Sequence, residues 1–164
     1  MARSDIESLR IPATTVEDNA RQMISSLKES AVIENMPVRE KIASYRDLFV
    51  WQKGMDLVDL VYDLADTFPR REQFGLTSQI TRAAVSVPAN IAEGQARPSA
   101  KDFAHFLAVA RSSLHETETL LAVAIRRKFV SEPSTRGAFA MSCDLSKMLV
   151  TLRSSILKSN RATS

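Results

Sequence analysis

The 164-residue chain has little cysteine, glycine or aromatic side chain. Its single cysteine, Cys143, cannot form an intramolecular disulfide or a cysteine-rich zinc site, which excludes a disulfide-stapled secreted scaffold. Four glycines and six prolines exclude collagen-like and low-complexity classes. No apolar run approaches the roughly 18 residues of a spanning helix, and the first residues are polar and acidic. We therefore expect a cytoplasmic protein with no signal peptide and no membrane partner.

Charge is close to balanced, and its small surplus is unevenly placed. Lys and Arg total 22 and Asp and Glu total 19, for a net charge of +3. Residues 1–45 carry a net charge of −1 and residues 46–164 a net charge of +4. The basic clusters are Arg70-Arg71, Arg126-Arg127-Lys128 and a C-terminal series of Lys147, Arg153, Lys158 and Arg161. This surplus is compatible with nucleic-acid binding without requiring it, and a symmetric oligomer would multiply it.

Hydrophobic residues make up 45% of the chain and recur with a helical period, whereas strand patterns are nearly absent. After a short tail, residues 14–33 predict an amphipathic helix whose apolar face carries Met23, Ile24 and Leu27. That face must pack on the chain's own core or on a partner. We therefore divide the chain into an N-terminal tail with an accessory helix, residues 1–45, and a main domain, residues 46–164.

The main domain predicts an all-α, up-down four-helix bundle. Its helices are expected over residues 47–67, 76–95, 99–127 and 133–159. The first is apolar over a wide arc, which is typical of a helix that packs both inside its chain and against a second subunit. We expect Trp51 and Val61 to take part in the packing between subunits. Pro88 falls inside the second helix, where it should kink the helix or remove one backbone hydrogen bond.

A narrow polar ladder runs along the helix at 76–95. Its members step by three or four residues and so fall within roughly 80° of one another; they are Gln79, Arg82, Ser86, Asn90, Glu93 and Arg97. One interpretation is an internal network of hydrogen bonds and ion pairs between helices or subunits. The other is a channel lining or nucleic-acid surface that points Arg82 and Arg97 at phosphate. Likewise, Arg126, Arg127 and Lys128 form either a solvated helix end that matches the dipole or a phosphate contact.

Catalytic and metal-binding patterns are weak. His105 and His115 lie ten residues apart and so do not form an i, i+4 metal pair. Cys143 has no neighbouring base, and we expect it to be a small buried residue. There is no glycine-rich phosphate loop. Trp51, Tyr62 and Phe74 could stack on bases, but core packing is favoured for the first two. We expect no enzyme activity, no metal and no cofactor.

Several segments of the main domain carry a family resemblance. They are Leu48 to Lys53, Val61-Tyr62, Phe68-Pro69, Phe74-Gly75-Leu76, Gln79 to Gly94, Phe103, Phe106-Leu107, Ala110-Arg111 and Ser113-Leu114. In these segments the chain resembles the four-helix-bundle proteins first noticed as products of intervening sequences in bacterial large-subunit ribosomal RNA genes. The likeness is close over residues 46–130. It departs at Ser112, where the family usually has glycine, and residues 1–45 lie outside the family pattern.

The resemblance implies a homopentamer with a central channel and no known catalytic activity. A related bundle, the accessory protein of diversity-generating retroelements, is a basic pentamer that engages nucleic acid and a reverse transcriptase. By analogy, we predict a non-enzymatic homo-oligomeric scaffold that associates with RNA or DNA through a basic surface. The alternative is a protein–protein adaptor whose N-terminal amphipathic helix docks a partner.

Overall fold

The computed structural model describes residues 44–162, which belong to a unit spanning residues 42–164. Its elements are η3 (Tyr45–Asp47), α2 (Phe49–Ala65), η4 (Arg70–Glu72), α3 (Leu76–Gln95), α4 (Ala100–Arg126) and α5 (Glu132–Ala162). No strand occurs among these residues. The all-α prediction is therefore confirmed for this part of the chain, whereas the helix expected over residues 14–33 lies outside the described residues.

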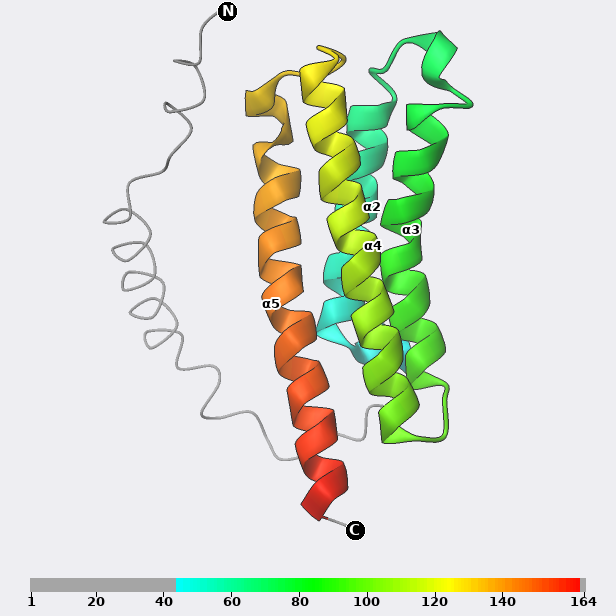
Figure 1. Ribbon diagram of the computed structural model, residues 1–164, viewed down its shortest axis with the longest axis vertical. Helices are drawn as coiled ribbons and strands as arrows, with labels where there is room; N and C mark the ends of the chain where they lie inside the picture. The colour runs from blue at the N-terminus through cyan, green and yellow to red at the C-terminus, as the bar shows by residue number, and fades with distance from the viewer. Residues whose placement is uncertain (1–43, 163–164) are drawn as a thin grey trace, which may run out of the picture. The chain divides into compact units, whose positions relative to one another are not determined.

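The four long helices form an up-down bundle (Figure 1). Consecutive helices run antiparallel, and among these four helices each contacts only its two neighbours around the ring. The α2–α5 interface closes this ring, and α3 and α4 share the largest interface. The two connections at one end are the segment containing η4 and the α4–α5 loop, so residues near 70 and near 128 lie at the same end of the bundle.

A continuous apolar core runs along the bundle axis and receives side chains from all four helices. Its fully buried members include Leu57, Val61, Ile80, Ile91, Leu107, Leu114, Leu121, Leu145 and Leu149. Each such side chain contributes about 1.5–3 kcal/mol through burial. Because these positions recur at three- and four-residue steps, the helical period in the sequence predicts most of them.

The expected helix starts are present. Ser99 Oγ accepts a hydrogen bond from the Asp102 backbone N–H at 3.0 Å, which caps α4. Pro133 lies in the first turn of α5, where its missing N–H costs no helical hydrogen bond.

Pro88 is accommodated inside the 20-residue helix α3, which continues past it to Gln95. The proline is buried on the side of α3 that faces α2. A Cβ built on Gly54 of α2 would lie 3.4 Å from the Pro88 Cβ. The pyrrolidine ring therefore packs against α2 at Gly54, where an added Cβ would make an ordinary van der Waals contact with it. The packing of Pro88 against α2 offsets part of the cost of the missing backbone donor.

Three expectations about exposure are wrong. Val61 is 0% exposed inside the chain's own core, so it is not available to a second subunit. Cys143 is exposed, because it lies on the outward face of α5 beside the buried Ser142. Tyr62 is 45% exposed and lies outside the core. Trp51 is half-buried and packs edge-on against Tyr45, with ring centroids 5.3 Å apart.

Candidate nucleic-acid interface

Two basic clusters that are more than 50 residues apart in sequence meet at one end of the bundle. We call this surface the basic end, and its cationic side chains are Arg70, Arg71, Arg126, Arg127 and Lys128. The two segments that form it, residues 66–75 and 126–132, carry five basic and three acidic side chains. All five cationic residues are exposed.

Phe129 joins the two clusters. The Arg71 Cζ lies 5.8 Å from the centroid of the Phe129 ring, and the Arg127 Cζ lies 5.9 Å from the same centroid. The two guanidinium carbons are therefore within about 12 Å of each other. Phe129 is held in turn by Phe68, whose ring centroid is 5.9 Å away and which is only 8% exposed. A core-anchored ring thus positions two arginines from separate connections.

The end of α4 has a Schellman geometry with an unusual residue at its turn. The Phe129 N–H donates to the Ala124 carbonyl at 2.9 Å, and the Lys128 N–H donates to the Ile125 carbonyl at 2.9 Å. Lys128 has φ 59°, a left-handed conformation that is usually taken by glycine. A lysine there is strained, and strain of this kind is often retained at functional sites.

The basic end also carries the most exposed aromatic side chain of the described residues. Phe74 follows η4 and is 92% exposed. The nearby carboxylate of Glu72 already has two partners. It lies 3.9 Å from Arg71 Nε, and it accepts a hydrogen bond from the Leu76 N–H at 3.4 Å. Exposed aromatic rings and cationic side chains are together the features that bind single-stranded nucleic acid, through base stacking and phosphate contacts.

The polar ladder of α3 does not form one continuous surface. At its centre, Asn90 Nδ2 donates to the Ser86 carbonyl at 2.7 Å and to Ser86 Oγ at 3.0 Å. The Ser113 hydroxyl of α4 reaches the same Ser86 Oγ at 3.2 Å. This part of the ladder therefore faces α4. Gln79 and Arg82 are exposed.

At the far end of the ladder, Arg97 pairs with Glu93, and its Cζ lies 5.1 Å from the Phe106 ring centroid. Arg82 and Arg97 are separated by 15 residues, which is about 22 Å along a helix axis. The structure therefore does not bring these two arginines together. Arg97 lies at the opposite end of the bundle from Arg126, Arg127 and Lys128.

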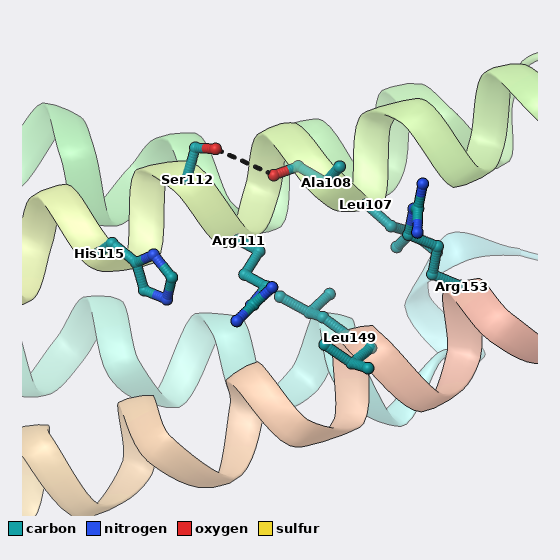
Figure 2. Close-up of a pocket in the computed structure, with 8 residues that line it drawn as sticks. Leu107, Ala108, Arg111, Ser112, His115, Leu149 and Arg153 are labelled. Atoms are coloured by element: carbon teal, nitrogen blue, oxygen red, sulfur yellow. Dashed lines mark hydrogen bonds between the residues drawn. The ribbon is translucent and has the colours of Figure 1, made fainter.

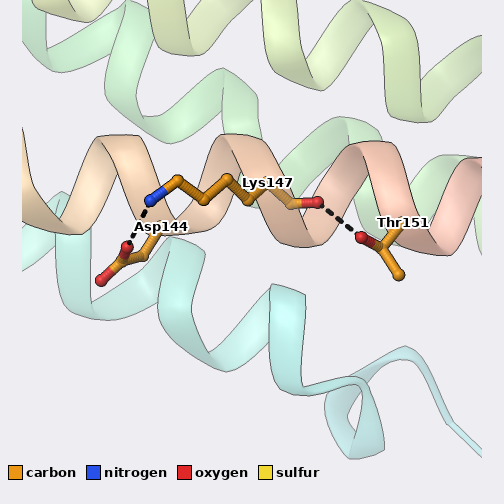
Figure 3. A network of polar contacts seen from close by, with 3 residues as sticks. All are labelled: Asp144, Lys147 and Thr151. Atoms are coloured by element: carbon orange, nitrogen blue, oxygen red, sulfur yellow. Dashed lines mark hydrogen bonds and ion pairs between the residues drawn. The ribbon is translucent and has the colours of Figure 1, made fainter. Parts of the chain in front are cut away.

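The basic residues of the C-terminal series differ in whether an acidic side chain pairs with them. Lys147 Nζ lies 3.4 Å from Asp144 Oδ1, and Thr151 Oγ1 donates to the Lys147 carbonyl at 3.0 Å (Figure 3). Slight burial lowers the pKa of Lys147, but Cys143 and Asp144 raise this pKa by more, so the pKa lies above 10.5. Lys147 is thus already paired with an acid, whereas Arg153 of the same helix forms no ion pair among the described residues.

Sequence reasoning noted Arg70, Arg71 and Phe74 but did not assign the arginines to a site, and it missed Phe129. The available signal was the aromatic residue directly after a basic run at a helix end. Among the described residues, no group of three histidine, cysteine, aspartate or glutamate side chains could hold a metal ion. None of the described helices is long and apolar enough to cross a membrane.

The fold and the site define the class: a small antiparallel four-helix bundle whose helix connections gather basic side chains at one end. The chain belongs to the 23S rRNA-intervening sequence protein family, whose model matches residues 46–151. A crystal structure of a protein of unknown function from the S23 ribosomal protein family of Bacteroides thetaiotaomicron VPI-5482 is similar, with 25% sequence identity and a TM-score of 0.59. The match covers 63% of this chain and 97% of that one. We found no match among curated proteins.

Proposed function

We propose that this protein is a non-enzymatic, homo-oligomeric scaffold that binds single-stranded RNA or DNA through the basic end. The observation that carries the proposal is that Arg71 and Arg127 both approach the ring of Phe129, which packs on the buried Phe68. Clustered like charges repel one another and destabilise the compact state. An anionic ligand relieves that repulsion, and phosphates supply the matching charge.

Phe74 gives the proposal its preference for single strands. The bases of a duplex are already stacked on one another, whereas unpaired bases offer a free face to an aromatic side chain. Base stacking on a protein ring contributes about 1–3 kcal/mol per base.

Binding of the full chain to a fluorescein-labelled 20-nucleotide oligo(dT) or RNA, followed by anisotropy between 50 and 300 mM KCl, tests the proposal. We expect affinity to fall steeply with salt. Replacing both Arg127 and Lys128 with glutamine should reduce the slope of log K against log salt by about 1.4, since each single-strand phosphate contact contributes about 0.7. Phe74→Ala should weaken binding about tenfold, and Phe49→Ala should not. Phe49 is a matched control because it is 60% exposed at the opposite end of the bundle.

Two other results would redirect the proposal. If Arg82→Ala with Arg97→Ala abolishes binding and the basic-end variants do not, the contact surface lies along α3. If the protein binds no oligonucleotide but captures a protein partner in a salt-insensitive manner, the adaptor alternative is favoured. That alternative relies on Met23, Ile24 and Leu27, which lie outside the described residues.

The oligomeric part of the proposal rests on the family resemblance. Half-buried Trp51 and the exposed side chains of Met55 and Tyr62 give α2 an apolar outer surface that a second subunit could cover. Light scattering coupled to gel filtration of the full chain should give a mass five times 18.2 kDa. A monomeric mass would remove both the channel and the multiplication of charge.

A further inference from the structure

A groove on the side of the bundle, between α4 and α5, has a second and separate concentration of positive charge. We call it the α4–α5 groove; it encloses about 330 Å³. The lining residues used below are Leu107, Arg111 and His115 of α4 and Leu149 and Arg153 of α5. Arg111 precedes Arg126 by 15 residues, so the groove lies about 22 Å along α4 from the basic end. None of the described residues that line it is acidic.

Both arginines are anchored through the same nitrogen, each to the opposite helix. Arg111 Nε donates to Ser146 Oγ of α5 at 3.1 Å, and Arg153 Nε donates to the Ala104 carbonyl of α4 at 3.2 Å. The two anchors are separated by seven residues on each helix, because antiparallel packing pairs equivalent turns. Seven residues correspond to about 10 Å along a helix axis.

This anchoring leaves the terminal nitrogens of both guanidinium groups for a ligand. Nε fixes the plane of each fork, and the Nη groups present paired donors that suit a carboxylate or phosphate. Neither arginine takes part in any of the ion pairs found among the described residues. Each helix therefore contributes one arginine whose guanidinium group is fixed beside the groove and keeps its positive charge.

The lining has a charged–apolar–charged order. Figure 2 shows Arg111 and His115 extending together from α4 at one end of the groove, and Arg153 at the other end, with Leu149 between them. Leu107 and Leu149 are at most 1% exposed, so they form a closed apolar floor. A volume of about 330 Å³ is at the lower end of the range for small-molecule sites.

We propose that the α4–α5 groove binds a small elongated molecule that carries an oxyanion at each end, with Arg111 and His115 holding one oxyanion and Arg153 the other. Phosphate and carboxylate share the chemistry that the two forks recognise. The aliphatic or sugar carbons of such a ligand cover the apolar floor. This site is independent of the proposed nucleic-acid function, because it shares no residue with the basic end.

The test measures thermal stabilisation of the full chain by three defined probes: fructose 1,6-bisphosphate, fructose 6-phosphate and the dicarboxylate adipate. A ligand at ten times its Kd should raise the Tm by about 4 °C. We expect the bisphosphate or adipate to produce this shift, and the two probes distinguish phosphate from carboxylate. Fructose 6-phosphate, which has one charged end, should bind at least about tenfold more weakly.

Variants assign the shift to the groove. Arg111→Gln and Arg153→Gln should each weaken binding at least about tenfold, and the charge-retaining Arg153→Lys should restore only part of it. Arg82→Gln is the matched control. Arg82 is exposed and forms no ion pair with another residue of the described part of the chain, and it lies on α3, a helix that does not contact α5. Circular dichroism of each variant verifies that the fold is retained.

Three results would overturn the inference. They are no shift with any probe up to 10 mM, equal shifts in Arg82→Gln and the two groove variants, and equal affinity for the one-ended and two-ended phosphates. If a 12-nucleotide oligonucleotide binds through Arg111 and Arg153 while the small probes do not, the groove is part of the nucleic-acid surface and the small-molecule proposal fails. A loss of oligonucleotide binding confined to the basic-end variants leaves the groove proposal intact.

Discussion

Lys128 offers the sharpest test of how the fold and the proposed binding surface are connected. Its φ of 59° places a side chain with a Cβ in the left-handed region, which costs about 1–2 kcal/mol. Glycine avoids this cost, but the greater conformational freedom of a glycine in the unfolded chain reduces stability by about 0.5–1 kcal/mol. Lys128→Gly should therefore raise the free energy of unfolding by about 0.5–1 kcal/mol.

Three substitutions at this position separate backbone strain from charge. Lys128→Gly, Lys128→Asn and Lys128→Ala all remove the same charge, but only glycine and, less fully, asparagine tolerate the left-handed backbone. In urea denaturation we expect the order of stability to be Gly, then Asn, then Ala with Lys. In anisotropy titrations all three variants should lose the same amount of salt dependence, about 0.7 in the log–log slope.

The reasoning is refuted if Lys128→Ala gains as much stability as Lys128→Gly. That result would mean that the stabilisation comes from reduced repulsion with Arg126 and Arg127 and not from the backbone. If the three variants bind nucleic acid as well as the unchanged protein does, neither the charge nor the backbone strain of Lys128 contributes to binding at the basic end.

Three further predictions concern the stability of the bundle. Gly94→Ala should destabilise by about 1–2 kcal/mol in urea denaturation, since its Cβ would lie 2.6 Å from the Phe106 Cβ and overpacking outweighs the gain in helix propensity; an unchanged midpoint would show that α3 and α4 can separate freely. Gly137→Ala should stabilise by about 1 kcal/mol, because among the described residues nothing beyond its chain neighbours and its own helix backbone lies within 4 Å of its Cβ position, and a loss would indicate an unseen neighbour. Ser142→Ala should cost about 1–3 kcal/mol, because the hydroxyl of this 1%-exposed serine donates to Glu118 Oε1 at 2.5 Å; a Tm within 1 °C of the unchanged protein would argue against that hydrogen bond.

The helices could be predicted from the sequence because their signals are local. The helix expected over residues 76–95 is observed as Leu76–Gln95, and the Ser99 cap and the Pro133 start are both present. These features depend on residues within one or two turns of each other. Exposure was harder, as the buried Val61 shows. A wide apolar arc does not reveal which of its edges faces the other helices.

The sites depend on distances between helices, which the sequence pattern does not contain. Arg71 and Arg127 meet only because both connections end at the same end of the bundle. Arg111 and Arg153 share a groove only because α4 and α5 pack antiparallel in one particular register. In the sequence, Arg111 was part of the family resemblance and Arg153 part of a basic series, with nothing to relate one to the other.

The closure of the helix ring has a consequence for the order of folding. Three of its interfaces join consecutive helices through connections of ten residues or fewer, whereas the α2–α5 interface joins the first and last helices of the bundle. Contacts between consecutive helices require little loop closure and form early. Forming the α2–α5 interface, here called the α2–α5 seam, fixes the two ends of a segment that contains all of α3 and α4. Its entropic cost is therefore larger than that of the interfaces between consecutive helices. We therefore expect this seam to form last as the chain folds and to separate first when it unfolds.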